Sequence, residues 1–171
     1  YYAQGMHPTT KHALHSTGKS WTSAIWHDAL LPVMDKTVGE LMPELAQSVY
    51  GDQTVRNVVD MRTPVFWYED YADPESPVVL SFAAVGLEYK NDEYETVAFT
   101  NTLKRNPKLE DGDWYYVSNN SNLMGLLGPR LAGVSAYEGT RQFLDALGME
   151  YISGSAANLH GQYDAGGGQY M

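Results

Sequence analysis

The chain has 171 residues, of which 43% are hydrophobic and 19% charged, a composition typical of globular proteins rather than disordered or membrane proteins. At this length a chain can bury roughly 70% of its unfolded surface, so we expect a single domain over residues 1–171. The formal net charge of −10 repels phosphate groups and anionic lipid surfaces. Since no cluster of Lys and Arg offers a local exception, nucleic acids and membranes are excluded as partners.

Cysteine is absent, which excludes disulfides, thiol nucleophiles and cysteine-based zinc sites. Both reducing and oxidising compartments tolerate a chain without cysteine, so a soluble protein in the cytoplasm, in the periplasm or outside the cell fits equally. No run of about 18 apolar residues is present to span a membrane. The chain begins at Tyr1 without the layout of a signal peptide, and we expect a processed product or a fragment.

The first half of the chain predicts irregular structure followed by short helices. Residues 1–15 are polar and broken by Gly and Pro, and a helix is expected from Ser16 until Pro32, with an apolar stripe at helical spacing. Residues 36–45 predict a short helix or turn that Pro43 interrupts. Thr54 is expected to cap a helix that carries Val55 and Val58.

The second half predicts a long loop, two clear helices and a glycine-rich tail. Residues 63–78 carry three prolines among aromatic and acidic residues and predict an ordered loop, whereas residues 79–105 indicate helix only weakly. A turn at 110–114 precedes a helix over 120–131 that Gly133 ends. Ser135 and Glu138 form a capping-box pattern for a further helix, which Gly148 stops. The tail over 153–171 is expected to be loop.

The most informative stretch for function is His15-Ser16-Thr17-Gly18-Lys19-Ser20. Ser16 and Lys19 are three residues apart at a helix start, so they share one face and the amine can reach the hydroxyl. Burial and the positive end of the helix dipole both disfavour a charged ammonium, and a neutral amine can accept the serine proton. The backbone N–H of Ser16 at the helix start can help to hold a developing oxyanion.

Other interpretations of these residues are open. A Ser-x-x-Lys pattern also describes a solvated helix start, and Gly18-Lys19-Ser20 resembles the end of a phosphate-binding loop. That loop requires a glycine at position 13, where this chain has Ala13, and a preceding apolar strand that is missing. Three histidines at 7, 12 and 15 lack an acidic partner at metal-ligand spacing, so no metal site is predicted. The acidic pair at 69 and 70 is expected to belong to a solvated loop, since adjacent side chains in extended structure point apart.

Several segments resemble one family in the same order along the chain. STGKSWTSAI at 16–25 resembles the nucleophile helix of serine β-lactamases, esterases and 6-aminohexanoate-dimer (nylon-oligomer) hydrolases. The segment VGELMPELAQSVYGDQTVRNVVDMRTPV at 38–65 is similar to a helical part of these proteins. WYEDYADPESPV at 67–78 resembles a loop most typical of the nylon-oligomer hydrolases, while FLDALGME at 143–150 and DAGGGQYM at 164–171 resemble later turns.

The resemblance implies roles for further residues. Tyr116-Val117-Ser118 is similar to the family's second motif, Tyr-x-Asn or Tyr-x-Ser, and lies 100 residues after Ser16. By that resemblance Tyr116 would hydrogen-bond to Ser16, shuttle protons with Lys19 and protonate the leaving group. Tyr71 would contact the substrate from its loop, or be a stacked structural tyrosine. Ser118 would bind substrate by donating a hydrogen bond near the site, or cap a helix.

The fold implied is the α+β fold of the β-lactamase/transpeptidase class, with this chain covering mainly its α-rich part and lacking the terminal sheet strands. The activity implied is hydrolysis of a small-molecule amide or ester through an acyl-enzyme, without a cofactor or metal, and self-association into a homo-oligomer is left open. Two departures stand out. Phe82 occupies the place of an acidic residue expected eleven positions after the loop tyrosine, and the third motif, Lys-Thr-Gly or His-x-Gly, is missing. Two alternatives to the hydrolase interpretation are a non-catalytic binding or structural domain of the same fold and a nucleotide-binding protein.

Overall fold

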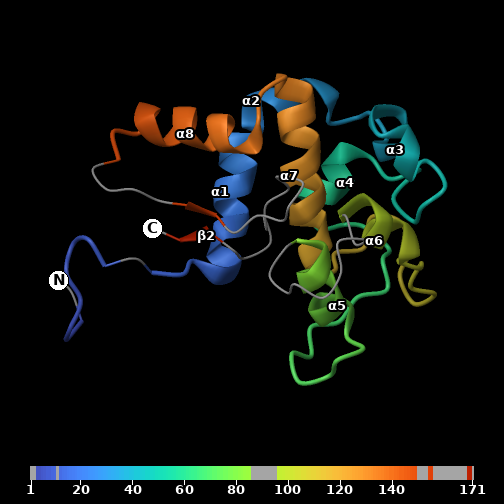
Figure 1. Ribbon diagram of the computed structural model, residues 1–171. Helices are drawn as coiled ribbons and strands as arrows, with labels where there is room; N and C mark the ends of the chain where they lie inside the picture. The colour runs from blue at the N-terminus through green and yellow to red at the C-terminus, as the bar shows by residue number, and fades with distance from the viewer. Residues whose placement is uncertain (1–2, 11, 86–95, 150–153, 156–168, 171) are drawn as a thin grey trace.

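The computed structural model describes residues 3–10, 12–85, 96–149, 154–155 and 169–170, and in these it is mostly helical (Figure 1). The α-helices are α1 (Gly18–Ile25), α2 (His27–Leu30), α3 (Val38–Leu41), α4 (Val55–Val59), α5 (Pro77–Ala84), α6 (Thr96–Thr102), α7 (Ser118–Ala132) and α8 (Ala136–Ala146). The 3-10 helices are η1 (His15–Thr17), η2 (Leu31–Val33) and η3 (Pro43–Leu45). Strands β1 (Gly154–Ser155) and β2 (Gln169–Tyr170) pair antiparallel.

Helix α7 is the centre of the arrangement. It contacts α1, α2, α4, α5, α6 and α8, and Figure 1 shows it between α1 on one side and α4 to α6 on the other. The N-terminal ends of α1 and α7 lie toward the same end of the molecule, the lower end in Figure 1. The segments that precede these two helices in the chain are therefore brought toward one another, which matters for the site below.

The hydrophobic core lies between α7 and the segments 38–67, 78–84 and 99–103. Its fully buried members include Leu45, Trp67 and Leu123, which are at most 1% exposed. Burying side chains of this size stabilises the fold by about 1.5–3 kcal/mol each. The core thereby fixes the position of α7 relative to the loop that follows Trp67.

The break between α1 and α2 occurs at Trp26, which adopts φ −100° and ψ 9° and is 2% exposed. Its ring packs against Gly128 of α7 and Gly139 of α8, where a Cβ would lie 2.2 Å from a ring atom in each case. Only glycine permits such close approach. The predicted continuous helix from Ser16 to Pro32 is therefore wrong in detail, because the tertiary packing of Trp26 divides it.

Beneath the first turn of α7 lies a buried layer of polar side chains. Asn120 Oδ1 accepts hydrogen bonds from the Tyr50 phenol at 2.8 Å and from Thr63 Oγ1 at 3.0 Å, while Asn119 Nδ2 donates to Thr100 Oγ1 at 3.1 Å. Burial raises the pKa of Tyr50 above its usual value, so its phenol remains a donor. These bonds join α7 to three segments far apart in sequence and fix its rotation about its axis.

The predicted helix ends are confirmed where the signal is local. Ser135 and Glu138 form a reciprocal capping box at α8, and Thr54 Oγ1 accepts from the backbone N–H of Asn57 at 3.1 Å. Gly133, with φ +68°, ends α7 in the left-handed conformation that glycine adopts at no steric cost. The expected interruption at Pro43 is confirmed, because α3 ends at Leu41 and a separate 3-10 helix, η3, begins at Pro43.

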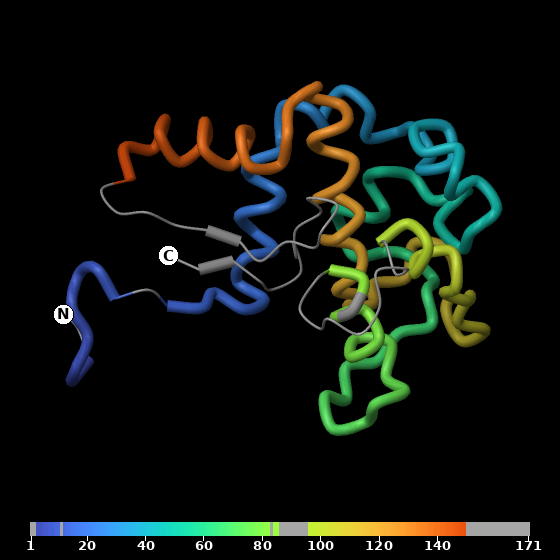
Figure 2. The backbone as a smooth tube through the Cα atoms, viewed as in Figure 1, coloured from blue at the N-terminus to red at the C-terminus, as the bar shows by residue number. Residues whose placement is uncertain are grey.

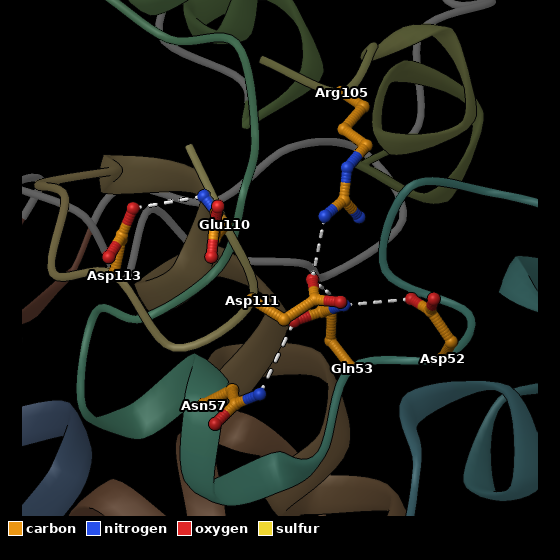
Figure 3. Close-up of polar contacts among 7 residues, drawn as sticks. All are labelled: Asp52, Gln53, Asn57, Arg105, Glu110, Asp111 and Asp113. Carbon is orange, nitrogen blue, oxygen red and sulfur yellow. Dashed lines mark hydrogen bonds and ion pairs between the residues drawn. The ribbon is translucent and has the colours of Figure 1, made fainter. Parts of the chain in front are cut away.

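A polar cluster fixes the predicted turn at 110–114 (Figure 3). Asp111 pairs with Arg105 at 3.0 Å and also accepts from Gln53 Nε2 at 3.3 Å. Gln53 is 2% exposed and receives a further bond from Asn57 Nδ2 at 3.3 Å. The cluster joins the turn to the residues on either side of Thr54, and so supports the segment that leads into Tyr116.

Other predictions are confirmed only in part. Residues 3–10 contain no helix or strand and lead away from the helices (Figure 2). The loop predicted over 63–78 ends at Ser76, and the weakly helical region 79–105 contains the end of α5 and all of α6, with 86–95 outside the described residues. The tail prediction is wrong at β1 and β2, because backbone pairing over two residues leaves no periodic signal. Most of the remaining tail, including the segment 164–168, also lies outside the described residues.

No helix in the part described is long and apolar enough to cross a membrane.

Candidate active site

Ser16 lies in the 3-10 turn η1, directly before α1. The preceding residue, His15, has φ +46°, a left-handed conformation that is uncommon for a residue other than glycine. Thr17 Oγ1 donates to the carbonyl of Leu14 across this turn. Helix α1 thus begins at Gly18, two residues later than predicted, and the turn presents the Ser16 side chain to solvent.

Lys19 is close to Ser16, as the three-residue spacing predicts. Its Nζ donates to Ser16 Oγ over 3.0 Å. Lys19 is only 8% exposed, whereas Ser16 is an exposed residue. An accessible hydroxyl is therefore held against an amine that the protein covers, which is the arrangement a Ser-Lys nucleophile requires.

Tyr116 lies against the same amine. Lys19 Nζ is 5.1 Å from the centroid of the Tyr116 ring, within the range of a cation–π contact. The backbone next to it is anchored, since Tyr115 donates its backbone N–H to Met61 O at 2.8 Å and its phenol to Trp67 O. The structure therefore brings Ser16, Lys19 and Tyr116 together from two segments about 100 residues apart.

Ser118 begins α7 and is tied to the loop after Trp67. Its hydroxyl donates to Glu69 Oε1, and it makes no capping bond, because the residue at the cap position is Val117. Val117 is extended, with φ −136° and ψ 106°. Ser118 is therefore two residues from Tyr116, at the point where the extended segment enters α7.

Tyr71 occupies the predicted loop and is 62% exposed. Its ring stacks on Phe82 of α5, with centroids 6.1 Å apart and planes 24° apart, and its phenol donates to Glu69 Oε2 at 3.1 Å. Phe82, which departs from the family pattern, thus supports Tyr71 in its loop. The loop is also held by its own bonds, such as that from the Tyr68 phenol to Asp73 Oδ2 at 2.9 Å, so the prediction of an ordered loop is confirmed.

Glu69 is the residue that the sequence interpretation missed. The prediction of a solvated pair is wrong for it, because its half-buried carboxylate accepts from Ser118, from Tyr71 and from the Trp67 indole at 2.9 Å. Asp70 is exposed, as expected, and accepts from the backbone N–H of Ala72. The only signal was the position of Glu69 two residues before Tyr71, since its partner Ser118 is 49 residues away.

Metal ligation has no support in the part of the chain that is described. No group of three or more His, Asp or Glu side chains there could hold a metal ion. His7, His12 and His15 are all exposed, in agreement with the expectation of polar surface residues.

The chain is similar in sequence and in fold to known hydrolases. The chain is 31% identical over 150 residues to the 6-aminohexanoate-dimer hydrolase of Paenarthrobacter ureafaciens, covering 84% of this chain and 38% of that protein. Among solved structures, a Bacillus anthracis protein with the provisional name 6-aminohexanoate-dimer hydrolase superposes with a TM-score of 0.83 at 18% identity, covering 99% of this chain and 46% of the other. The chain is a homologue of 6-aminohexanoate-dimer hydrolase. No family model matches it.

The chain shares its fold with the wider β-lactamase/transpeptidase class. A β-lactamase/D-alanine carboxypeptidase from Pseudomonas syringae superposes with a TM-score of 0.63 at 16% identity, covering 96% of this chain and 48% of the other. The resemblance found in the sequence is therefore confirmed, and the relatives are hydrolases of this fold. The chain spans less than half the length of each of these three relatives.

Proposed function

We propose that the chain is part of a serine hydrolase that cleaves an amide or ester bond through an acyl-enzyme, with Ser16 as the nucleophile. The observation that carries the proposal is the 3.0 Å contact between Lys19 Nζ and Ser16 Oγ, made beside the Tyr116 ring. The substrate is a small molecule with an accessible carbonyl. The relatives' activity supports the proposal as an analogy of fold.

In the first half-reaction Ser16 Oγ attacks the carbonyl carbon while its proton passes to Lys19 Nζ. The backbone N–H of Ser16, at the start of a helical segment, supports the negative charge that develops on the carbonyl oxygen. Tyr116 relays the proton to the leaving group as the tetrahedral intermediate collapses, which leaves an ester between Ser16 and the acyl group. Water then attacks this ester, and the same groups move its proton back to Ser16 Oγ.

The loop tyrosine suggests where the substrate binds. Tyr71 is exposed and supported by Phe82, so it offers an aromatic wall next to the segment that carries Ser118. A phenylalanine beneath this wall, in place of an acidic residue, argues for an uncharged part of the substrate there. The substrate-binding roles of Tyr71 and Ser118 belong to this proposal.

A fluorophosphonate probe tests the proposed nucleophile. Such probes phosphonylate activated serines, so we expect the wild-type chain to be labelled and the Ser16→Ala variant not to be. Ser20→Ala is the matched control, because Ser20 is an exposed serine next to Lys19 in sequence and should leave labelling unchanged. Equal labelling of wild type and Ser16→Ala would refute the proposal, and labelling of neither would favour a non-catalytic domain.

A further inference from the structure

Three donors converge on the carboxylate of Glu69, and one of them anchors it. The Trp67 indole donates to Oε1 at 2.9 Å, and Trp67 is only 1% exposed. Ser118 Oγ donates to the same oxygen, and the Tyr71 phenol donates to Oε2 at 3.1 Å. A carboxylate linked to a buried indole is held in place, so it can orient the two hydroxyl groups that reach it.

The contact determines what Ser118 can offer to a bound molecule. A serine hydroxyl has one proton to donate and two lone pairs that accept, and an ionised carboxylate can only accept. Because the Ser118 proton is directed at Glu69, the remaining capacity of Ser118 Oγ is that of an acceptor. A bound molecule would therefore have to present a donor to it.

Ser118 is placed to meet the reacting part of a substrate. Only the extended residue Val117 separates Ser118 from Tyr116, whose ring lies against Lys19 Nζ. At the scissile bond an amide carries an N–H group, which can donate to Ser118 Oγ. An ester carries an oxygen at the same place, which has no proton to donate and would face the accepting side of Ser118 Oγ.

We propose that Glu69 is a positioning residue that keeps Ser118 as a hydrogen-bond acceptor and thereby makes the site prefer amide over ester substrates. The inference rests on the proposed hydrolase function and names a substrate class for it. Glu69 acts only through the orientation of Ser118 and takes no proton from the substrate.

The test compares a p-nitroanilide with the p-nitrophenyl ester of the same acyl group, which differ in N–H against oxygen. Glu69→Ala removes the acceptor, so the Ser118 proton is free to turn toward a bound molecule. We expect the ratio of kcat/KM for the anilide to that for the ester to fall about three- to tenfold, as for one lost hydrogen bond. A purely structural role would lower both rates together and leave the ratio unchanged.

Two further variants keep the result specific. Asp70→Ala removes the same charge from the same loop without contacting Ser118, so it should keep the wild-type ratio. Ser118→Ala should lower the ratio as Glu69→Ala does, and the double variant should lower it no further. Ser118→Ala also supplies the result if Glu69→Ala fails to fold.

Two outcomes would overturn the inference while leaving the hydrolase function intact: an unchanged ratio in active Glu69→Ala, or a Glu69→Ala effect that persists in the Ser118→Ala background. A wild-type chain that hydrolyses neither substrate and is not labelled by fluorophosphonate would refute the proposed function itself, and the inference with it. Labelling thus separates the two failures.

Discussion

The amine of Lys19 is the group on which the proposed chemistry depends. In Lys19→Met the side chain keeps a similar length but cannot accept a proton, so we expect kcat/KM for a p-nitrophenyl ester to fall by about 10²–10⁴, the usual contribution of a general base. Lys104→Met, at an exposed lysine, is the control and should retain activity. Steady-state kinetics give the answer, and a Lys19→Met variant as active as wild type would remove the amine from the mechanism.

Tyr116 and its neighbour Tyr115 allow a matched comparison. Tyr116→Phe keeps the ring against Lys19 but loses the phenol, so kcat for an anilide, whose amine must be protonated to leave, should fall by about 10²-fold or more. Tyr115→Phe removes only the bond to the Trp67 carbonyl and should leave kcat within a few-fold of wild type while lowering stability. If both variants kept wild-type kcat, the proton relay would have to be assigned elsewhere.

Residue identity alone revealed part of this site. The spacing of Ser16 and Lys19 predicted their contact because both lie within one turn, and the family resemblance added Tyr116, whose ring does meet Lys19. Glu69 was missed because its role depends on Ser118, which folding brings from 49 residues away. Contacts set by tertiary structure leave no local pattern to find.

At the scale of elements, the packing of Trp26 between two helices gives a stability prediction. A methyl group at position 128 would lie 2.2 Å from the Trp26 ring, so Gly128→Ala should lower the free energy of unfolding by about 1–3 kcal/mol despite the higher helix propensity of alanine. Urea unfolding measures this, with Ala132→Ser at the exposed end of α7 as the control. A stabilised Gly128→Ala variant would show that the helices separate easily.

The cap of α8 gives an independent prediction. Ser135 Oγ accepts from the backbone N–H of Glu138 at 3.2 Å, so Ser135→Ala should lower the free energy of unfolding by about 0.5–2 kcal/mol. Ser135→Asp retains a side-chain acceptor and should restore most of the loss, also in urea unfolding. No difference between the alanine and aspartate variants would mean that the cap contributes nothing to global stability.

Elements with local signals were predicted well and those with tertiary causes were not. Helix α8 has both a capping box and a terminal glycine in its sequence, and both occur in the structure. Helix α7 starts at Ser118, two residues before the predicted start, because the extended segment that ends at Val117 passes directly into it. The break at Trp26 required knowledge of Gly128 and Gly139, which no periodicity in that segment contains.

At the scale of the whole molecule, the pair of Glu44 and Arg130 joins η3 to the last turn of α7 across 86 residues. The hydrogen bond from Arg130 holds the pKa of Glu44 below its usual value of 4.5. A carboxyl whose pKa is lower when folded stabilises the protein above the unfolded pKa, and this contribution is lost as the pH falls through the folded pKa.

Glu44→Gln should therefore lower the free energy of unfolding near neutral pH by about 0.2–1 kcal/mol, because the pair is partly exposed. The difference from wild type should shrink once the pH falls below the usual carboxyl range. Urea titrations at several pH values measure it, and Glu75→Gln, at an exposed carboxylate, should follow wild type throughout. A difference that grew at acid pH would contradict the assigned direction of the pKa shift.

The central claim is that Ser16 becomes covalently acylated, and its local sequence makes this directly measurable. Trypsin cleavage after Lys11 and Lys19 gives a peptide of residues 12–19 whose only serine is Ser16, whereas Ser20 falls in the next peptide. After reaction with a fluorophosphonate, mass spectrometry should find the adduct on residues 12–19. An adduct on any other peptide, or a reactive protein in which residues 12–19 stay unmodified, would contradict the account.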